Sequence, residues 1–121
     1  ERDAGKADKV VAGQVDGSMP VGEGALDAVA AGKVAVAYEP VWAIGTGLTP
    51  TLEQIEEVHR AVRAAMIDRL GPAVAARPIL YGGSVKPENA REILAVPEVG
   101  GALVGGASLK AADFLAIVRA A

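Results

Sequence analysis

Glu39 is the residue best placed for acid–base chemistry, because it directly follows the apolar run at 34–38. This run is rich in β-branched residues and bounded by turn residues, which predicts a strand buried on both faces, as in parallel sheets. A carboxylate at the mouth of such a strand would be partly desolvated and could act as a general base near neutral pH. From position alone, a surface glutamate that merely caps a strand is an equally good interpretation.

Two glycine doublets follow the next two apolar runs and could bind an anion. Gly82-Gly83-Ser84 follows the run at 78–81, and Gly105-Gly106 follows the run at 102–104. Glycine N–H groups can approach an anion closely because no Cβ is in the way, and Ser84 adds a hydroxyl. One doublet alone would indicate only a tight turn. Two doublets after successive strands favour an anion site, and neither motif carries a dedicated Arg or Lys.

Gly45 belongs to a loop that could cover such a site. The loop begins after Pro40 and contains the large apolar residues Trp42 and Ile44. Such residues on an exposed loop are expected to pack over something, which favours a lid over a plain turn. The N–H group of Gly45 could be turned toward an anion. The triplet Gly45-Thr46-Gly47 lacks the spacing of a dinucleotide fingerprint and the lysine of a P-loop, so nucleotide binding is not indicated.

His59 is the single histidine of the chain, which also contains no cysteine. It lies within the clearest predicted helix, whose apolar residues recur at helical spacing from Leu52 to Met66. A single histidine without partner ligands does not make a metal site, so we expect none. We interpret His59 as a solvated position on the helix surface.

Strands and helices alternate along the chain in a way that would place these residues together. A helical lead-in is expected over residues 1–33, interrupted by glycines at 13, 17, 22 and 24, followed by three strand–helix units over 34–121. In the last helix, Leu115 and Val118 are expected to point inward. The alternation predicts a single α/β unit over 1–121 with parallel strands, and ligands bind at the carboxyl ends of such strands. A doubly wound sheet and a piece of a (β/α)₈ barrel both fit.

Composition narrows the possible functions. The chain of 121 residues is 51% apolar, as expected of one small globular domain or a piece of a larger one. Its net charge of −3 offers no basic surplus, so we expect no nucleic-acid partner. No apolar run approaches the roughly 18 residues of a membrane span, so we expect no membrane partner either. Because the chain opens at Glu1 without a methionine, in polar sequence that reads as mid-element, we expect a cut piece.

Three motifs together resemble triosephosphate isomerases. Residues 37–47 (AYEPVWAIGTG) are similar to the catalytic strand and lid of that family, and residues 81–85 (YGGSV) and 101–109 (GALVGGASL) to its next two strand ends. The resemblance implies the C-terminal portion of a (β/α)₈ barrel, with about three strands and their helices. It implies that Glu39 moves a proton between two carbons of a triose phosphate, and that the phosphate is bound by residues Gly45, Ser84, Gly105 and Gly106.

The resemblance also implies a cytoplasmic homodimer of glycolysis and gluconeogenesis, without metal or organic cofactor, because enolisation needs only a base, an electrophile and hydrogen bonds. The family's catalytic Lys and Asn on its first strand and His on its fourth have no counterpart here. With three strands against the eight of a barrel of about 250 residues, we expect the isolated chain to be inactive. Two alternatives stay open: a half-barrel that serves only as a phosphate-binding or assembly module, and another phosphate-binding barrel enzyme. The lid sequence argues against the second.

Overall fold

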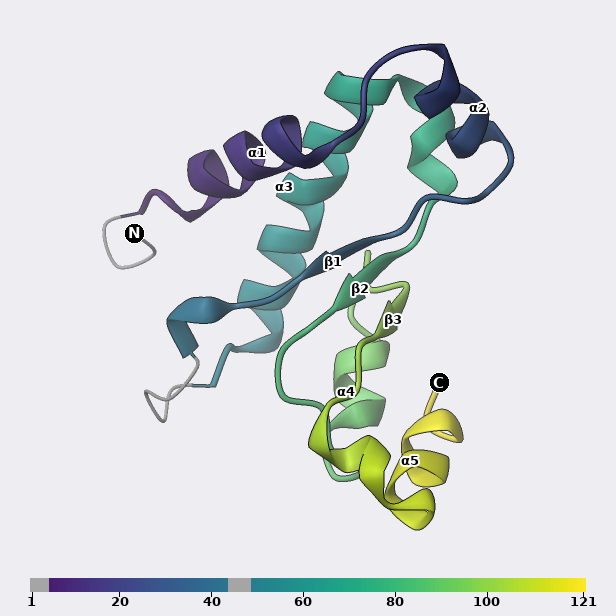
Figure 1. The fold of residues 1–121 in the computed structure, drawn as a ribbon. Coiled ribbons are helices and arrows are strands. Elements are labelled where there is room, and N and C mark those ends of the chain that lie inside the picture. Colours follow the sequence, from purple (N-terminus) through teal and green to yellow (C-terminus); the bar gives the residue numbers. More distant parts are fainter. Residues whose placement is uncertain (1–4, 44–48) are drawn as a thin grey trace.

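The computed structural model describes residues 5–43 and 49–121, and helices alternate with short strands along them (Figure 1). The α-helices are α1 (Ala7–Ser18), α2 (Glu23–Ala30), α3 (Leu52–Leu70), α4 (Ala90–Leu94) and α5 (Ala111–Val118). The strands are β1 (Val36–Tyr38), β2 (Ile79–Tyr81) and β3 (Gly101–Ala102). Short 3₁₀ helices lie at η1 (Val41–Ala43), η2 (Pro72–Ala76) and η3 (Gly106–Leu109).

The three strands form one parallel sheet in the order β1-β2-β3, as the alternation predicts. Tyr38 is opposite Tyr81, which in turn is opposite Ala102. Two further backbone hydrogen bonds run past the strand ends, from Gly82 N–H to the Tyr38 carbonyl (2.7 Å) and from Leu103 N–H to the Tyr81 carbonyl (2.9 Å). The three carboxyl ends therefore lie at one edge of the sheet, where the candidate residues follow them.

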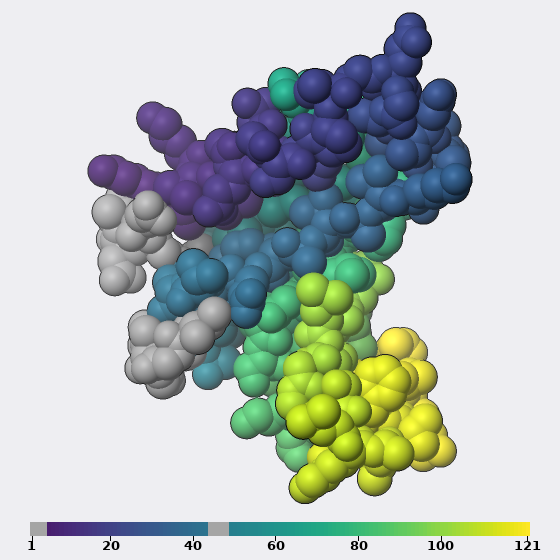
Figure 2. All heavy atoms as spheres, in the orientation of Figure 1, coloured from purple at the N-terminus to yellow at the C-terminus, as the bar shows by residue number. Residues whose placement is uncertain are grey.

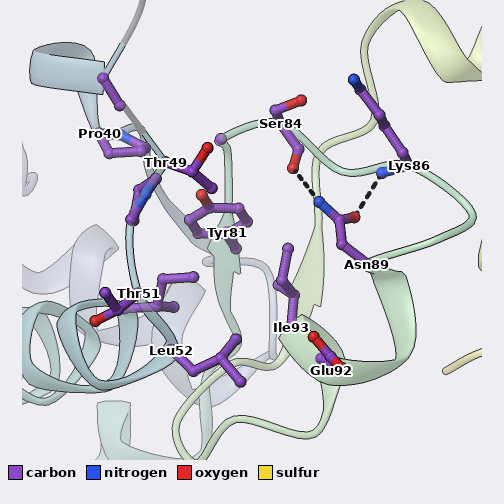
Figure 3. Close-up of a pocket in the computed structure, with 14 residues that line it drawn as sticks. Pro40, Thr49, Thr51, Leu52, Tyr81, Ser84, Lys86, Asn89, Glu92 and Ile93 are labelled. Carbon is purple, nitrogen blue, oxygen red and sulfur yellow. Dashed lines mark hydrogen bonds between the residues drawn. The ribbon is translucent and has the colours of Figure 1, made fainter. Parts of the chain in front are cut away.

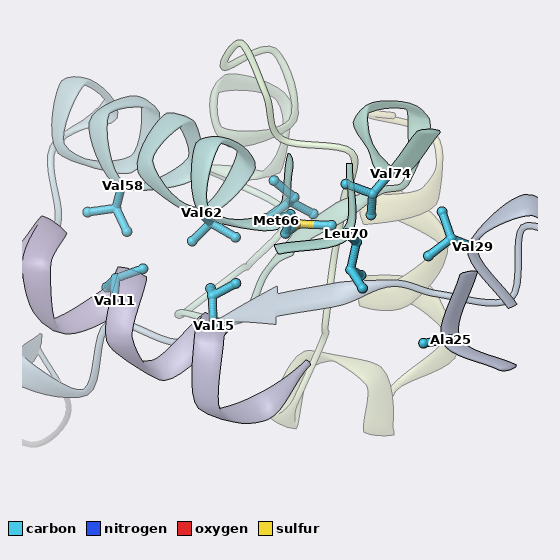
Figure 4. Packing of buried hydrophobic residues seen from close by; sticks show 10 residues of the cluster. Val11, Val15, Ala25, Val29, Val58, Val62, Met66, Leu70 and Val74 are labelled. Atoms are coloured by element: carbon cyan, nitrogen blue, oxygen red, sulfur yellow. The ribbon is translucent and has the colours of Figure 1, made fainter. Parts of the chain in front are cut away.

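A first core cluster joins α1 to α3. Val11 and Val15 of α1 point toward Val58 and Val62 of α3, and all four are buried (Figure 4). Helix α1 continues through Gly13 and Gly17, so the break predicted there is wrong. A glycine costs a helix only about 1 kcal/mol, which the burial of two valines outweighs. The chain turns instead at Gly22, whose φ of 98° is in the region that favours glycine.

Helix α3 is the central helix, since it contributes to both cores. Thr51 caps its first turn by accepting from the Gln54 N–H (3.2 Å), while the Gln54 side chain accepts from the Thr51 N–H (3.0 Å), and the two bonds together form a capping box. Beyond the first cluster, a second core gathers around β2, α4 and α5. Its buried members are Ile55, Tyr81, Val85, Ala90, Ile93, Val96 and Ile117.

The second face of the sheet is largely uncovered, so the prediction that the first strand is buried on both faces is wrong. Val36 and Tyr38 pack against the first core, whereas Ala37 between them is exposed. Ala37 is in register with the half-buried Leu80, and Leu103 at the end of β3 is 50% exposed.

Helix α5 is also less buried than its sequence predicts. Leu115 and Val118, expected to point inward, are 48% and 52% exposed, and Ile117 is the buried residue instead. Figure 2 shows this end of the chain projecting from the rest of the molecule, so α5 has neighbours on one side only. Several apolar side chains of α5 are therefore left exposed to solvent.

Candidate active site

Glu39 lies directly after β1, at the carboxyl edge of the sheet, and its side chain is exposed. It lines a hollow of about 300 Å³ together with Gln14 of α1, Tyr38 and Trp42. The partial desolvation that the sequence predicts is therefore not present. The physical reason is that β1 is an edge strand of this sheet, so the described residues offer no strand on its other side.

A tight turn fixes the backbone at Glu39. The Glu39 carbonyl accepts from the Val41 N–H (2.8 Å), and the carbonyl of the buried Pro40 accepts from the Ala43 N–H (2.9 Å). The indole Nε1–H of Trp42 donates to the Tyr38 hydroxyl (3.3 Å). Glu39 thus lies between β1 and η1, and the hydrogen bond from Trp42 to Tyr38 connects these two elements across it.

Ser84 and Gly106 lie along a second hollow, of about 470 Å³, so the structure brings the ends of two successive strands together. Lys86 and Lys110 line the same hollow, as do the acidic residues Glu88 and Asp113. Both lysines lie outside the glycine motifs, so those motifs alone do not predict them. Their spacing, two residues after Ser84 and four after Gly106, is the sign of them in the sequence.

Asn89 holds the turn that carries Ser84. Its amide nitrogen donates to the Ser84 carbonyl (3.1 Å), and its amide oxygen accepts from the Lys86 N–H (2.8 Å) (Figure 3). Ser84, Lys86 and Asn89 also line a third hollow, of about 370 Å³, whose apolar wall includes Tyr81 and Ile93. The sequence gives no direct sign of this role, because Asn89 reads simply as a polar residue ahead of a helix.

The two glycine doublets differ in what they do. A Cβ at Gly82 would lie 3.0 Å from the Tyr38 carbonyl oxygen, and one at Gly83 would collide with the Tyr81 ring and hydroxyl. The first doublet is therefore required by close packing. At Gly105 and Gly106 an added Cβ meets no atom within 4 Å, so the backbone there faces open space. Only the second doublet leaves room for a ligand against the backbone.

The structure does not bring all the predicted residues into one cavity. Ser84 and Gly106 line the same hollow, and Gly105 is the residue directly before Gly106 in the chain. Glu39 lines a different hollow, against α1. Gly45, the predicted lid donor, lies outside the described residues.

His59 is completely buried, so its interpretation as a solvated helix position is wrong. Its Nδ1 lies 3.3 Å from the Glu98 carbonyl oxygen, and its ring packs at 6.0 Å from Tyr38 and 6.3 Å from Tyr81, between ring centres. Burial is the main cause that lowers the pKa of His59, and nearby Arg63 acts in the same direction against the opposing effects of Glu98. The imidazole is therefore held in its neutral form.

Acidification should destabilise the chain through His59. Because the folded-state pKa is lowered, the unfolded chain binds the proton more tightly, and the stability contributed by neutral His59 is lost as the pH falls below about 6.5. This group should lower the free energy of unfolding by at most about 1.4 kcal/mol per pH unit. Urea unfolding between pH 7 and 5 measures the slope, with His59→Phe as the control. If the parent and the variant have the same slope, the prediction is wrong.

The described part of the chain contains no group of three His, Asp or Glu side chains that could hold a metal ion. Within residues 5–43 and 49–121, no helix combines the length and apolar character needed to cross a bilayer.

Known proteins similar to this chain agree on one family. The family model described as triosephosphate isomerase matches residues 1–121. A triosephosphate isomerase of Acidiphilium cryptum is 60% identical over 124 residues, covering 100% of this chain and 48% of that protein. One of Rhodopseudomonas palustris is 62% identical over 117 residues, covering 97% of this chain and 44% of that protein. The chain thus spans about half the length of the curated relatives it matches.

A solved structure gives the same result for the fold. The crystal structure of triosephosphate isomerase from Bartonella henselae superposes with a TM-score of 0.83 at 42% identity, covering 99% of this chain and 46% of that one. The parallel order β1-β2-β3 is thus part of a (β/α)₈ barrel, as the resemblance implies, and not of a doubly wound sheet. With a family model matching its whole length, the chain belongs to the triosephosphate isomerase family.

Proposed function

We propose that this chain supplies the base and part of the phosphate site of a triosephosphate isomerase, which interconverts dihydroxyacetone phosphate and glyceraldehyde 3-phosphate. In this reaction Glu39 removes a proton from the carbon next to the carbonyl group, giving an ene-diolate. The same carboxyl group returns the proton to the neighbouring carbon, while a second proton moves from the hydroxyl oxygen to the former carbonyl oxygen, so no atom or electron is gained or lost. The proposal is carried by the place of Glu39, which directly follows a barrel strand at the carboxyl edge.

The phosphate site is proposed at Ser84, Gly105 and Gly106, with Gly45 as a further backbone donor. The shared hollow of Ser84 and Gly106 supports this proposal, since its size is ample for a phosphate group. The open space at Gly105 and Gly106 leaves their backbone free to be approached. Lys86 and Lys110 on the wall of the hollow would add positive charge, partly offset by Glu88 and Asp113.

A hybrid barrel provides the test of this function. It joins the N-terminal part of the Acidiphilium cryptum relative, up to the matched region, to this chain. The 60% identity over that region makes compatible packing between the two parts a reasonable expectation. The hybrid should interconvert the two triose phosphates, and the hybrid carrying Glu39→Gln should not. A folded hybrid without isomerase activity would rule the proposal out.

Replacing Gly106 by valine should weaken phosphate binding in the hybrid barrel. A Cβ added at this position meets no atom within 4 Å, so we expect the valine to extend into the hollow without distorting the fold. Loss of one hydrogen bond to a charged group costs about 1.5–3 kcal/mol, which is about a ten- to hundredfold higher inhibition constant. Glycerol phosphate, which has the phosphate but no carbonyl group, is the ligand to use. Gly13→Val in α1, another open glycine, is the control. Equal inhibition constants for the two variants would show that Gly106 is not part of the phosphate site.

The cellular setting is proposed from the family. We propose a homodimer that acts in the cytoplasm in glycolysis and gluconeogenesis, takes a triose phosphate as its small-molecule partner, and uses no cofactor, nucleic acid or membrane.

A further inference from the structure

A buried histidine lies beneath the two strand ends that carry the proposed site. His59 contacts the rings of Tyr38 and Tyr81, which are opposite each other in β1 and β2. Tyr38 directly precedes Glu39, and Tyr81 precedes the Gly82-Gly83-Ser84 turn. One side chain thus touches the residues next to both the proposed base and the proposed phosphate site.

The histidine ring is fixed from its other side. The geometry fits an Nδ1–H group that donates to the Glu98 carbonyl (3.3 Å), which leaves Nε2 unprotonated and without a hydrogen-bond partner among the described residues. Glu98 has a φ of 68°, unusual for a residue other than glycine. Its carboxylate is held by the Arg63 Nε–H (2.8 Å), and Arg63 also donates to the Arg77 carbonyl. Helix α3 and the turn before β3 therefore clamp the imidazole.

Both tyrosines connect the histidine ring to the proposed site. The Tyr38 hydroxyl accepts from Trp42, which follows Glu39 in the chain, so a displaced Tyr38 ring would disturb the turn on both sides of Glu39. The Tyr81 ring lies against Gly83 so closely that no side chain fits there. A movement of this ring would therefore move the Ser84 turn.

We propose that His59 is a positioning residue, whose buried ring sets the Tyr38 and Tyr81 side chains and thereby the spacing between Glu39 and the Ser84 turn. The proposal rests on the proposed function for its kinetic consequence, but its structural part does not. His59 contacts no reacting atom and takes no part in proton transfer. The groups that surround it are Glu98 and Arg63, which act on its charge, and the rings of Tyr38 and Tyr81, which pack against it. This environment favours the neutral form of the imidazole.

The kinetic test uses variants of the hybrid barrel that distinguish the effect of losing the His59 ring from the effect of a general loss of stability. His59→Asn retains an N–H donor but removes the ring, and its kcat should fall about tenfold because small displacements of catalytic groups are costly. His59→Phe retains a ring and should recover most of this kcat. Val62→Ala, one turn along α3 in the other core cluster, serves as the control for lost packing and should retain the parent kcat. Should His59→Asn not fold, His59→Leu takes its place with the same expected result.

A second measurement is independent of activity. It is made on the 121-residue chain, in which Trp42 is the only tryptophan, so the fluorescence reports on the contact with Tyr38. The emission maximum of Trp42 should shift in His59→Asn, which lacks the ring, and stay unchanged in His59→Phe and Val62→Ala. If the parent hybrid is inactive, the proposed function fails while this measurement still tests the placement of Tyr38. Equal changes in the ring-free variant and in Val62→Ala, in emission or in kcat, would overturn the proposal.

Discussion

Replacing Glu39 by aspartate should lower the turnover of the hybrid barrel by about 10²-fold or more. The shorter side chain withdraws the carboxylate by about 1 Å, and a misplacement of this size is enough for such a loss. The charge, the strand and the turn at Pro40 remain, so the effect is expected in kcat and much less in binding. Steady-state assays in both directions of the interconversion measure it.

Glu23→Asp provides the matched control for this variant. Glu23 is also an exposed glutamate, in the first turn of α2 and outside the hollows described above. The same chemical change there should leave turnover unaltered. A Glu39→Asp variant as active as Glu23→Asp would mean that Glu39 is not the base.

The 121-residue chain by itself should show no turnover above a mock-purified control. The catalytic Lys, Asn and His that the resemblance implies for the family have no counterpart in this chain, and the loss of even one preorganised group typically costs about 10²–10³-fold in rate. Glu39 would then face a negatively charged ene-diolate without help. The sensitive measurement is product formation at high chain concentration over hours. Activity of the purified chain alone would contradict this division of catalytic roles.

The same chain should also associate with itself as its concentration rises. Both β1 and β3 are edge strands of the described sheet, and Phe114, Leu115 and Leu103 are strongly exposed. Unpaired strand edges and apolar surface favour such association. Light scattering over a range of concentrations measures it, and a mass that stays at 12.2 kDa throughout would be the contrary result.

The parts of the fold that could be predicted from sequence are those fixed by local chemistry. The helix over Leu52 to Met66 and the alternation of short apolar runs with helices can both be read from neighbours within a few residues. The failed expectations depend on partners far along the chain. Ala37 and Leu115 are exposed because nothing among the described residues covers them, and no local pattern could reveal this.

The candidate site divides in the same way. The spacing of the glycine motifs predicts that Ser84 and Gly106 follow neighbouring strands, and they do share a hollow. The burial of His59 cannot be read locally, because Arg60 and Arg63 lie near it in the sequence, while the tyrosines that pack against it are about twenty residues away on either side. Asn89 was missed because its role depends on the shape of the turn after β2.

Deuterium transfer tests most directly whether Glu39 is the base. The hybrid barrel and its Glu39→Gln variant would each be incubated with dihydroxyacetone phosphate in D₂O, and the remaining substrate and any product would be examined by proton NMR. A carboxyl group that holds the proton between two carbons can exchange it with solvent, so the parent should place deuterium on the carbon next to the carbonyl group. We predict deuterium incorporation by the parent and none above the uncatalysed level by Glu39→Gln. Equal incorporation by both proteins would contradict the assignment of Glu39 as the base.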